Sequence, residues 1–289
     1  MESWDARTGP PDKEAAGAGI DLAGLARDED RVAGQYRGEP MGPECALVEI
    51  AGRDSIAAAI ALAKGKALRL LLPSIVFTAT EYGDTAALFH NAERLRRLAQ
   101  PLGVEVANPV VLGSPRWWRA TIGRVNSVLS RDYGPWHICV GCHMYLHAVR
   151  APLAWEAGIA RQVGGERLGH GGKVKINQTR PAVEAYRGVL AEYGIDLELP
   201  LLEVDDEDAI RSLAGDWEEG EGQPGCVLSG NYRGLDGEVD CDHGRLRAYL
   251  DEYLVPVTRA ILRSLRERGE ADYDAQAAQV LGRLVEGGA

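Results

Sequence analysis

A membrane-spanning segment is the first feature that this 289-residue sequence lacks, because no apolar run approaches about 20 residues. Residues 1–11 also lack the basic-then-apolar order of a secretion signal, so we expect a cytoplasmic protein with no membrane partner. Positive charge is not in excess either. The net charge of −11 excludes a protein that coats nucleic acid with its whole surface, although a local basic patch stays open.

Several common catalytic motifs are also missing. No Gly-Lys pair is followed by Ser or Thr at the spacing of a Walker A loop. The one Gly-x-Gly-x-x-Gly match, at 220–225, lies in an acidic loop with no helix after it, which excludes a dinucleotide fingerprint. Nothing resembles a nucleophile elbow, so a Ser-His-Asp hydrolase is unsupported.

Strands and helices alternate along most of the chain. Apolar runs predict strands that begin at Cys45 and at 67–80, 104–112, 159–163 and 195–202, with helices at 56–64, 85–102, 144–157, 181–193 and 203–213. This order predicts an α/β fold with a doubly wound parallel sheet. A helical C-terminal extension follows at 244–269, with a kink at Pro256, and at 272–284.

The chain divides into three parts by composition. Residues 1–43 are rich in Gly, Pro and charged residues and predict a flexible leader, with a short helix around 21–33. We expect residues 44–214 to form the α/β domain. Residues 215–289 are expected to form a cysteine-containing loop and the C-terminal helices.

The turn after the first strand is the first candidate site. Gly52, Asp54 and Ser55 separate the strand from an Ala-rich helix. A strand, a glycine turn and a helix N-terminus direct several free backbone N–H groups at one point, which attracts phosphate. In a parallel sheet, ligands bind beyond the carboxyl ends of the strands, where this turn lies.

The second candidate site is the pair Cys139 and Cys142. Two cysteines at this spacing suit a tetrahedral metal, an iron–sulfur cluster or a redox pair, and two buried thiols at a helix start stay an alternative. A metal needs further ligands, and the candidates are Cys226, Cys241, His137, His143 and His243.

Residues 114–131 form a basic segment with two adjacent tryptophans. Trp117 and Trp118 either stack on nucleic acid bases or pack in the core, and both interpretations stay open. In the first interpretation the arginines of the segment contact phosphate, and in the second they contact acidic side chains of the protein. These arginines are Arg116, Arg119, Arg124 and Arg131.

The turn Ile50-Ala-Gly-Arg-Asp-Ser55 resembles the PP-loop of the ATP pyrophosphatase superfamily, Ser-Gly-Gly-x-Asp-Ser, at its last four positions. The order of this loop, the cysteine pair, Val163-Gly-Gly-Glu166 and Gln178-Thr179 resembles ATP-dependent tRNA-thiolating enzymes such as 4-thiouridine synthetase. The similarity covers residues 45–202. It implies an adenine nucleotide alpha hydrolase-like fold, with residues 44–214 as the PP-loop domain.

The resemblance also implies the site residues. ATP would be held by the loop and by the Gly-Glu signature: Ile50, Ala51, Gly52, Arg53, Asp54, Ser55, Gly165 and Glu166. The catalytic residues would be Asp54, which orients Mg²⁺, and Cys139 and Cys142. A four-iron cluster would be bound by Cys139, Cys142 and Cys226, with zinc as the alternative metal and Cys241 as the alternative third ligand. Near the nucleotide, His170 would transfer a proton and Lys173 and Lys175 would contact phosphate; a surface histidine in a Gly-rich loop and a solvated basic face stay the alternatives.

The implied reaction is adenylation of a substrate carbonyl oxygen with release of pyrophosphate, followed by replacement with sulfur. The sulfur would come from a sulfide on the cluster or from a persulfide on Cys139 or Cys142, whose thiolate a helix N-terminus would favour. The expected partners are ATP, a small heterocycle or a tRNA base, and a donor that delivers sulfide or a persulfide; a homodimer is left open.

Two other functions stay open. One is a PP-loop ligase that forms amides or nitriles, with structural or zinc-bound cysteines. The other is a non-catalytic nucleotide-binding or iron–sulfur regulatory protein, which the loss of Ser and Gly at Ile50 and Ala51 favours.

Overall fold

The computed structural model describes residues 30–171, 174–217, 222–239 and 242–287. Its centre is a parallel sheet in the order β4-β2-β1-β6-β7, with β5 also paired to β2. The strands of this sheet are β1 (Cys45–Ile50), β2 (Leu70–Phe77), β4 (Glu105–Val106), β5 (Val110–Gly113), β6 (Arg161–Val163) and β7 (Asp196–Glu198). A small antiparallel pair joins β3 (Glu81–Tyr82) to β8 (Gly225–Cys226).

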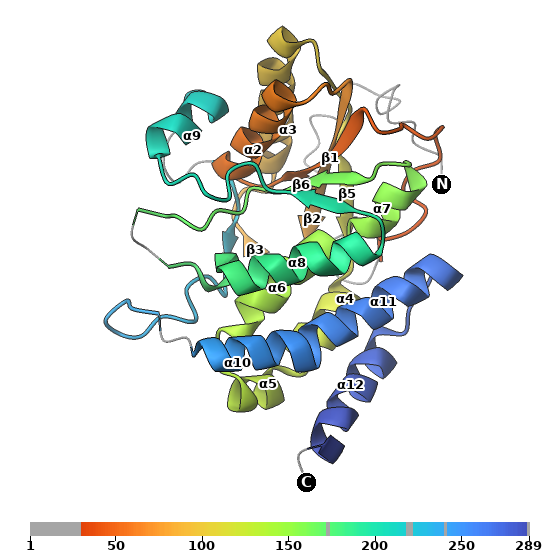
Figure 1. Ribbon diagram of the computed structural model, residues 1–289, viewed down its shortest axis with the longest axis vertical. Helices are drawn as coiled ribbons and strands as arrows, with labels where there is room; N and C mark the ends of the chain where they lie inside the picture. The colour runs from red at the N-terminus through yellow and green to blue at the C-terminus, as the bar shows by residue number, and fades with distance from the viewer. Residues whose placement is uncertain (1–29, 172–173, 218–221, 240–241, 288–289) are drawn as a thin grey trace.

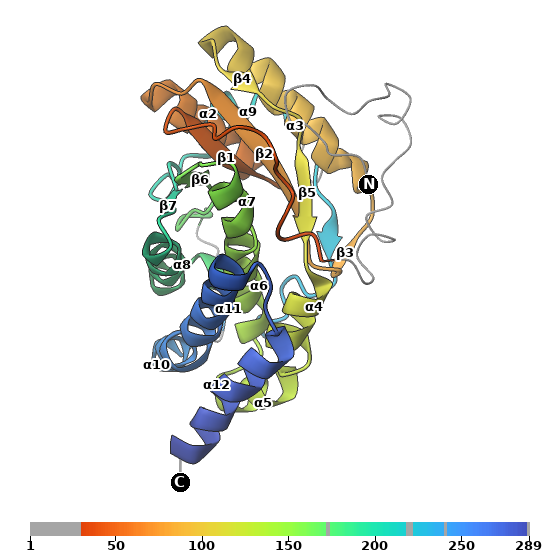
Figure 2. The same cartoon turned by 90° about the vertical axis from the view of Figure 1, so that its right-hand side faces the viewer.

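Helices cover both faces of the sheet (Figures 1 and 2). One face carries α2 (Arg53–Gly65), α3 (Ala86–Ala99) and α9 (Glu207–Ala214). The other face carries α6 (His137–Ala148), α7 (Ala151–Glu156) and α8 (Arg180–Glu192). Beyond these lie α4 (Pro115–Trp118), α5 (Asn126–Asp132), α10 (His243–Ala248), α11 (Val255–Arg268) and α12 (Tyr273–Gly287). The predicted α/β fold with a helical C-terminal part is confirmed.

Strand β1 shows why the two layers form. All six of its residues are buried, and alternate side chains point to opposite faces. Val48 and Ile50 pack in the core beneath α2 and α3, whereas Leu47 packs in the core on the side of α6 and α8. Each fully buried aliphatic side chain of this kind contributes about 1.5–3 kcal/mol. Glu49, one residue before the carboxyl end of β1, points to the α6 side, where its carboxylate contacts His147.

Three predicted elements are interrupted. The strand expected at 104–112 is two short strands, β4 and β5, because Pro109 between them has no N–H for the sheet. The basic segment 114–131 is α4, a π-helical stretch at Arg119–Gly123, and α5. The helix expected at 244–269 is α10, a π-helical stretch at Tyr249–Leu254, and α11, with Pro256 in the first turn of α11.

Residues 30–43, which the sequence assigned to a flexible leader, pack against the domain. Val32 and Tyr36 are buried, and residue 31 exchanges backbone hydrogen bonds with Gly113. The backbone N–H groups of Gln35 and Tyr36 donate to the Glu156 carboxylate at 3.0 Å. Residues 1–29, with most of the expected short helix, lie outside the described residues. The three-part division of the chain stays a prediction.

In the described part of the chain, none of the helices combines the length and the apolar character that a membrane span requires.

Candidate functional site

The predicted phosphate loop lies between β1 and α2, at the carboxyl edge of the sheet (Figure 1). Gly52 occupies the N-cap position of α2 and has no side chain with which to cap the helix. The Ser55 hydroxyl donates to the Gly52 carbonyl at 2.7 Å and accepts from the Ala51 N–H at 3.0 Å. Ser55 therefore holds the loop closed from inside instead of pointing outward. Ile50 is buried at the end of β1.

Gly165 packs directly on the start of α2. A Cβ at this position would lie 2.6 Å from the Ser55 nitrogen and 2.8 Å from the Asp54 carbonyl carbon. Both are backbone atoms, which cannot move aside as a flexible side chain can. The Gly-Glu signature after β6 is therefore brought against the phosphate loop, and only glycine fits at this contact.

Four charged side chains form a network at the start of α2. Asp54 accepts from Arg53 Nε at 3.1 Å and from Arg167 Nε at 2.9 Å. Glu207 from α9 pairs with the same two arginines at 2.6 and 2.9 Å. Asp54, the predicted Mg²⁺ residue, is thus ion-paired in this form of the protein. Magnesium would have to displace one arginine from it.

A segment distant in sequence also reaches the loop. A Cβ at Gly52 would lie 2.1 Å from Gln223 Oε1, so Gln223 lies against the loop. The Asn91 side chain donates to the carbonyls of Ala51 and Gly222, which joins this segment to the loop. Three residues further on, Cys226 lies in β8 and pairs with Glu81 beyond the end of β2.

The structure brings Cys139, Cys142 and Cys226 into one neighbourhood. All three are free thiols. Cys139 and Cys142 lie in the first turns of α6, and both are close enough to Cys226 for its charge to raise their pKa values. Cys139 Sγ donates to Asn231 Oδ1 at 3.1 Å, and Cys226 Sγ lies 3.4 Å from Thr80 Oγ1. Cys241 lies outside the described residues.

The expectation that the helix N-terminus favours thiolates is wrong for the protein without a bound metal. Burial, with a smaller effect from Cys226, raises the pKa of Cys139 to about 12. Burial also raises the pKa of Cys142 well above its usual range. Desolvation of the charged form outweighs the helix dipole, which is worth about 1 kcal/mol or less. Both thiols are therefore protonated near neutral pH.

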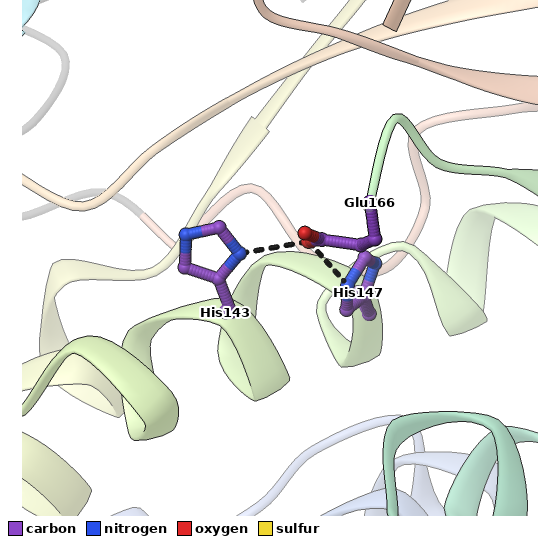
Figure 3. Close-up of side chains that lie close together, drawn as sticks. All are labelled: His143, His147 and Glu166. Atoms are coloured by element: carbon purple, nitrogen blue, oxygen red, sulfur yellow. Dashed lines mark hydrogen bonds and ion pairs between the residues drawn. The ribbon is translucent and has the colours of Figure 1, made fainter. Parts of the chain in front are cut away.

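A group of side chains that the sequence did not single out as a site lies between the loop and the cysteines (Figure 3). Glu166 Oε1 accepts from His143 Nδ1 at 2.8 Å and from His147 Nε2 at 3.1 Å. The other ring nitrogen of His147 donates to Glu49 Oε1 at 2.5 Å. Glu166 thus contacts the two histidines instead of the phosphate loop.

The charges of this group depend on one another. Burial alone would lower the pKa of His147, but the carboxylates of Glu49 and Glu166 raise it to about 9. Burial would raise the pKa values of both carboxyl groups, but the neighbouring histidines lower them, with Arg150 assisting at Glu49. A buried imidazolium is therefore held between two carboxylates.

Comparison with known proteins gives one clear relative. An uncharacterized protein of Methanocaldococcus jannaschii, MJ0009, is 34% identical over 224 residues, which are 76% of this chain and 80% of that protein. The chain belongs to the MJ0009 family. No family model matches the sequence. A solved structure, the U34-tRNA thiolase NcsA from Methanococcus maripaludis with its 4Fe-4S cluster, aligns with a TM-score of 0.36 and 12% identity. That alignment covers 86% of this chain and 73% of the thiolase.

In this member of the MJ0009 family, the basic segment does not present aromatic stacking surfaces. Trp117 is 2% exposed and stacks on Tyr273 at 5.6 Å, and Trp118 is also buried. The arginines meet acidic or carbonyl groups: Arg116 with Asp30, Arg119 with the Pro115 carbonyl, Arg124 with Asp274 and Arg131 with Asp132. The structure thus supports the packed interpretation of this segment.

Two of the remaining predicted residues lie close to the loop. Burial lowers the pKa of Lys175, whereas the nearby charges of Asp54 and Glu166 act against this effect. His170 Nε2 lies 2.5 Å from Gln178 Oε1. Burial lowers the pKa of His170, and the positive charges of Lys175 and Arg167 lower it further. Lys173 lies outside the described residues.

Two sequence signals could have indicated the missed group. Glu49 is the one charged residue in the apolar run 45–50, and a carboxylate at such a position must find a buried partner. His143 and His147 are four residues apart, which puts both on one side of a helix. The partner of both, Glu166, could not be assigned from spacing because it follows a different strand.

Proposed function

We propose that this protein is an ATP-dependent sulfurtransferase of the PP-loop type, which replaces a substrate carbonyl oxygen with sulfur. The observation that carries the proposal is that Cys139 and Cys226 both contact Leu228, in a segment whose Gln223 lies against the glycine turn before α2. These cysteines come from segments more than 80 residues apart in sequence.

The N-terminus of α2 suits the phosphates of ATP. Backbone N–H groups at a helix start bind phosphate, and Gly52 offers no side chain that competes for them. Arg53 and Arg167 neutralise phosphate charge once their contacts with Asp54 and Glu207 are exchanged for the ligand. Asp54, once released from these arginines, would hold Mg²⁺ at the phosphates.

The cysteines fit an iron–sulfur cluster better than one zinc ion. Three thiolates around a single zinc lie about 3.8 Å apart, given a bond length of about 2.3 Å. Among the described residues, the three-residue group with ligand atoms within 4.8 Å of one another contains no cysteine. A four-iron cluster binds each cysteine through a different iron, which needs wider spacing. Cys139, Cys142 and Cys226 would hold this cluster, whose fourth iron would supply a site for external sulfide.

The chain's own residues account for the remaining steps. The loop and α2 hold the triphosphate while the substrate carbonyl oxygen attacks the α-phosphorus and pyrophosphate leaves with Mg²⁺. Hydrosulfide sulfur then attacks the adenylated carbon, and AMP leaves with the former carbonyl oxygen. Because the buried tryptophans offer no stacking surface, we favour a small heterocycle over a tRNA base as the substrate.

Metal analysis tests the cysteine assignment. After anaerobic reconstitution, the protein should contain about four iron and four acid-labile sulfide atoms per chain. Cys226→Ser should lose most of both. Cys45→Ser is the matched control, since Cys45 is buried at the opposite end of β1 and donates to the Met41 carbonyl. Zinc without iron would contradict the cluster and favour a PP-loop ligase with zinc-bound cysteines.

A further inference from the structure

His143, His147 and Glu166 have the donor atoms and the spacing of a metal site. Each offers one ligand atom, and these atoms lie within 4.8 Å of one another. No other such group of three occurs among the residues that the structure describes. In Figure 3 both imidazole rings turn one nitrogen toward the same carboxylate oxygen.

The nitrogens that face away from the centre are held in place. Glu49 Oε1 accepts from His147 Nδ1 at 2.5 Å and from Gln162 Nε2 at 2.8 Å. Asn177 Nδ2 lies 2.8 Å from His143 Nε2, and its amide can present either nitrogen or oxygen to the ring. Metal-binding histidines are oriented by such contacts, most often by a carboxylate or a carbonyl group.

Glu166 is incompletely satisfied without a further ligand. Its side chain is 5% exposed, and Oε2 has no hydrogen-bond partner among the described residues. A buried carboxylate oxygen left without a partner destabilises the folded protein. A cation between the two imidazoles, coordinated by both oxygens of the Glu166 carboxylate, would also satisfy Oε2.

We propose that His143, His147 and Glu166 bind one divalent transition-metal ion, with at least one coordination position left for water or another ligand. Two imidazoles and one carboxylate suit zinc or ferrous iron rather than magnesium or calcium. The His143 side chain is 28% exposed and gives the ion a route inward, whereas His147 and Glu166 are buried. This site is separate from the cysteine cluster and does not depend on the proposed sulfur transfer.

The position of the ion connects the two predicted sites. Cys139, His143 and His147 follow one another at four-residue spacing along one side of α6. Glu166 comes directly after Gly165, which packs on the start of α2. The ion would therefore lie between the cysteines and the phosphate loop.

Metal titration of the full chain tests this site without ATP or sulfide. Cys139, Cys142 and Cys226 are first replaced by serine, so that the cysteine cluster cannot form. The chelator-treated protein is then titrated with Co²⁺ and with Zn²⁺, and stoichiometry and absorption are measured. Glu166→Gln and His143→Asn remove ligands, Asn177→Ala removes an orienting contact, and His90→Asn is the control because His90 is exposed on α3.

We expect one Co²⁺ or Zn²⁺ ion per chain, with the absorption of nitrogen and oxygen ligands. Asn177→Ala should weaken binding by about 10–100-fold, and the ligand substitutions by more. His90→Asn should bind as tightly as its parent. Binding unaffected by Glu166→Gln, or no stoichiometric binding in a folded parent, would overturn the site and leave the group as a metal-free ion network. If the serine background does not fold, the same variants in the native chain decide, since cobalt–thiolate absorption identifies ions on cysteine.

Discussion

Gly165→Ala tests the contact that joins the Gly-Glu signature to the phosphate loop. The added Cβ would lie 2.6 Å from the Ser55 nitrogen and 2.9 Å from the Ser55 Cα, well inside normal contact distance. Because these are backbone atoms, the segment after β6 and the start of α2 have to move apart. Overpacking of this kind costs about 1–3 kcal/mol.

Gly188→Ala is the matched control. Gly188 lies in α8, is exposed, and a Cβ there meets nothing within 4 Å. Alanine in a helix is about 0.5–1 kcal/mol better than glycine, so this variant should be slightly more stable. The two variants add the same methyl group, but Gly165→Ala should lower the free energy of unfolding and Gly188→Ala should raise it.

Urea unfolding and ATP titration measure both effects. We expect a lower unfolding midpoint for Gly165→Ala and ATP binding at least about tenfold weaker, since displacing the start of α2 by a few tenths of an ångström disturbs every N–H at the site. If Gly165→Ala is as stable as wild type and binds ATP equally well, the assignment of this contact to the phosphate site is wrong.

Three further predictions concern single residues. Ser55→Ala removes two hydrogen bonds within the loop and should lower the free energy of unfolding by about 1–3 kcal/mol, measured by denaturant titration. Trp117→Ala should cost about 3–5 kcal/mol, and a loss under about 1 kcal/mol would show that the side chain is not packed as described. In chelator-treated protein, the pKa of His147 is raised by Glu49 and Glu166 from 6.5 to about 9. Its contribution to stability should be complete below pH 6.5 and lost as pH rises through about 9, and thermal melts that are flat from pH 6 to 10 would contradict this.

The local features could be predicted because neighbouring residues determine them. The strand at Cys45–Ile50 is apolar throughout, and Gly52 is followed by a run of good helix formers, so the turn between them follows from adjacent residues. The alternation of strands and helices along the chain then predicts a parallel sheet. A parallel sheet in turn fixes the edge at which the loop lies. What the loop contacts did not follow, because Gln223 and Gly165 reach it from distant parts of the chain.

Properties that depend on tertiary packing could not be predicted. The environment of Trp117 was undecided because its partner Tyr273 lies 156 residues away. The acidity of Cys139 was misjudged because spacing places it at a helix start but does not show its burial. The link from Glu49 to His147 needs the packing of α6 on β1, which no local pattern specifies.

Product analysis with labelled ATP shows directly whether the protein adenylates its substrate and then replaces oxygen with sulfur. The cluster-loaded protein is incubated with Mg²⁺, sulfide and ATP labelled at the α- or γ-phosphate, together with carbonyl-containing heterocycles or bulk tRNA. We expect equal amounts of AMP and pyrophosphate and a thiolated product, with turnover reduced in Gly165→Ala and unchanged in Gly188→Ala. Formation of ADP and phosphate, or AMP formation that is insensitive to Gly165→Ala, would contradict this proposal.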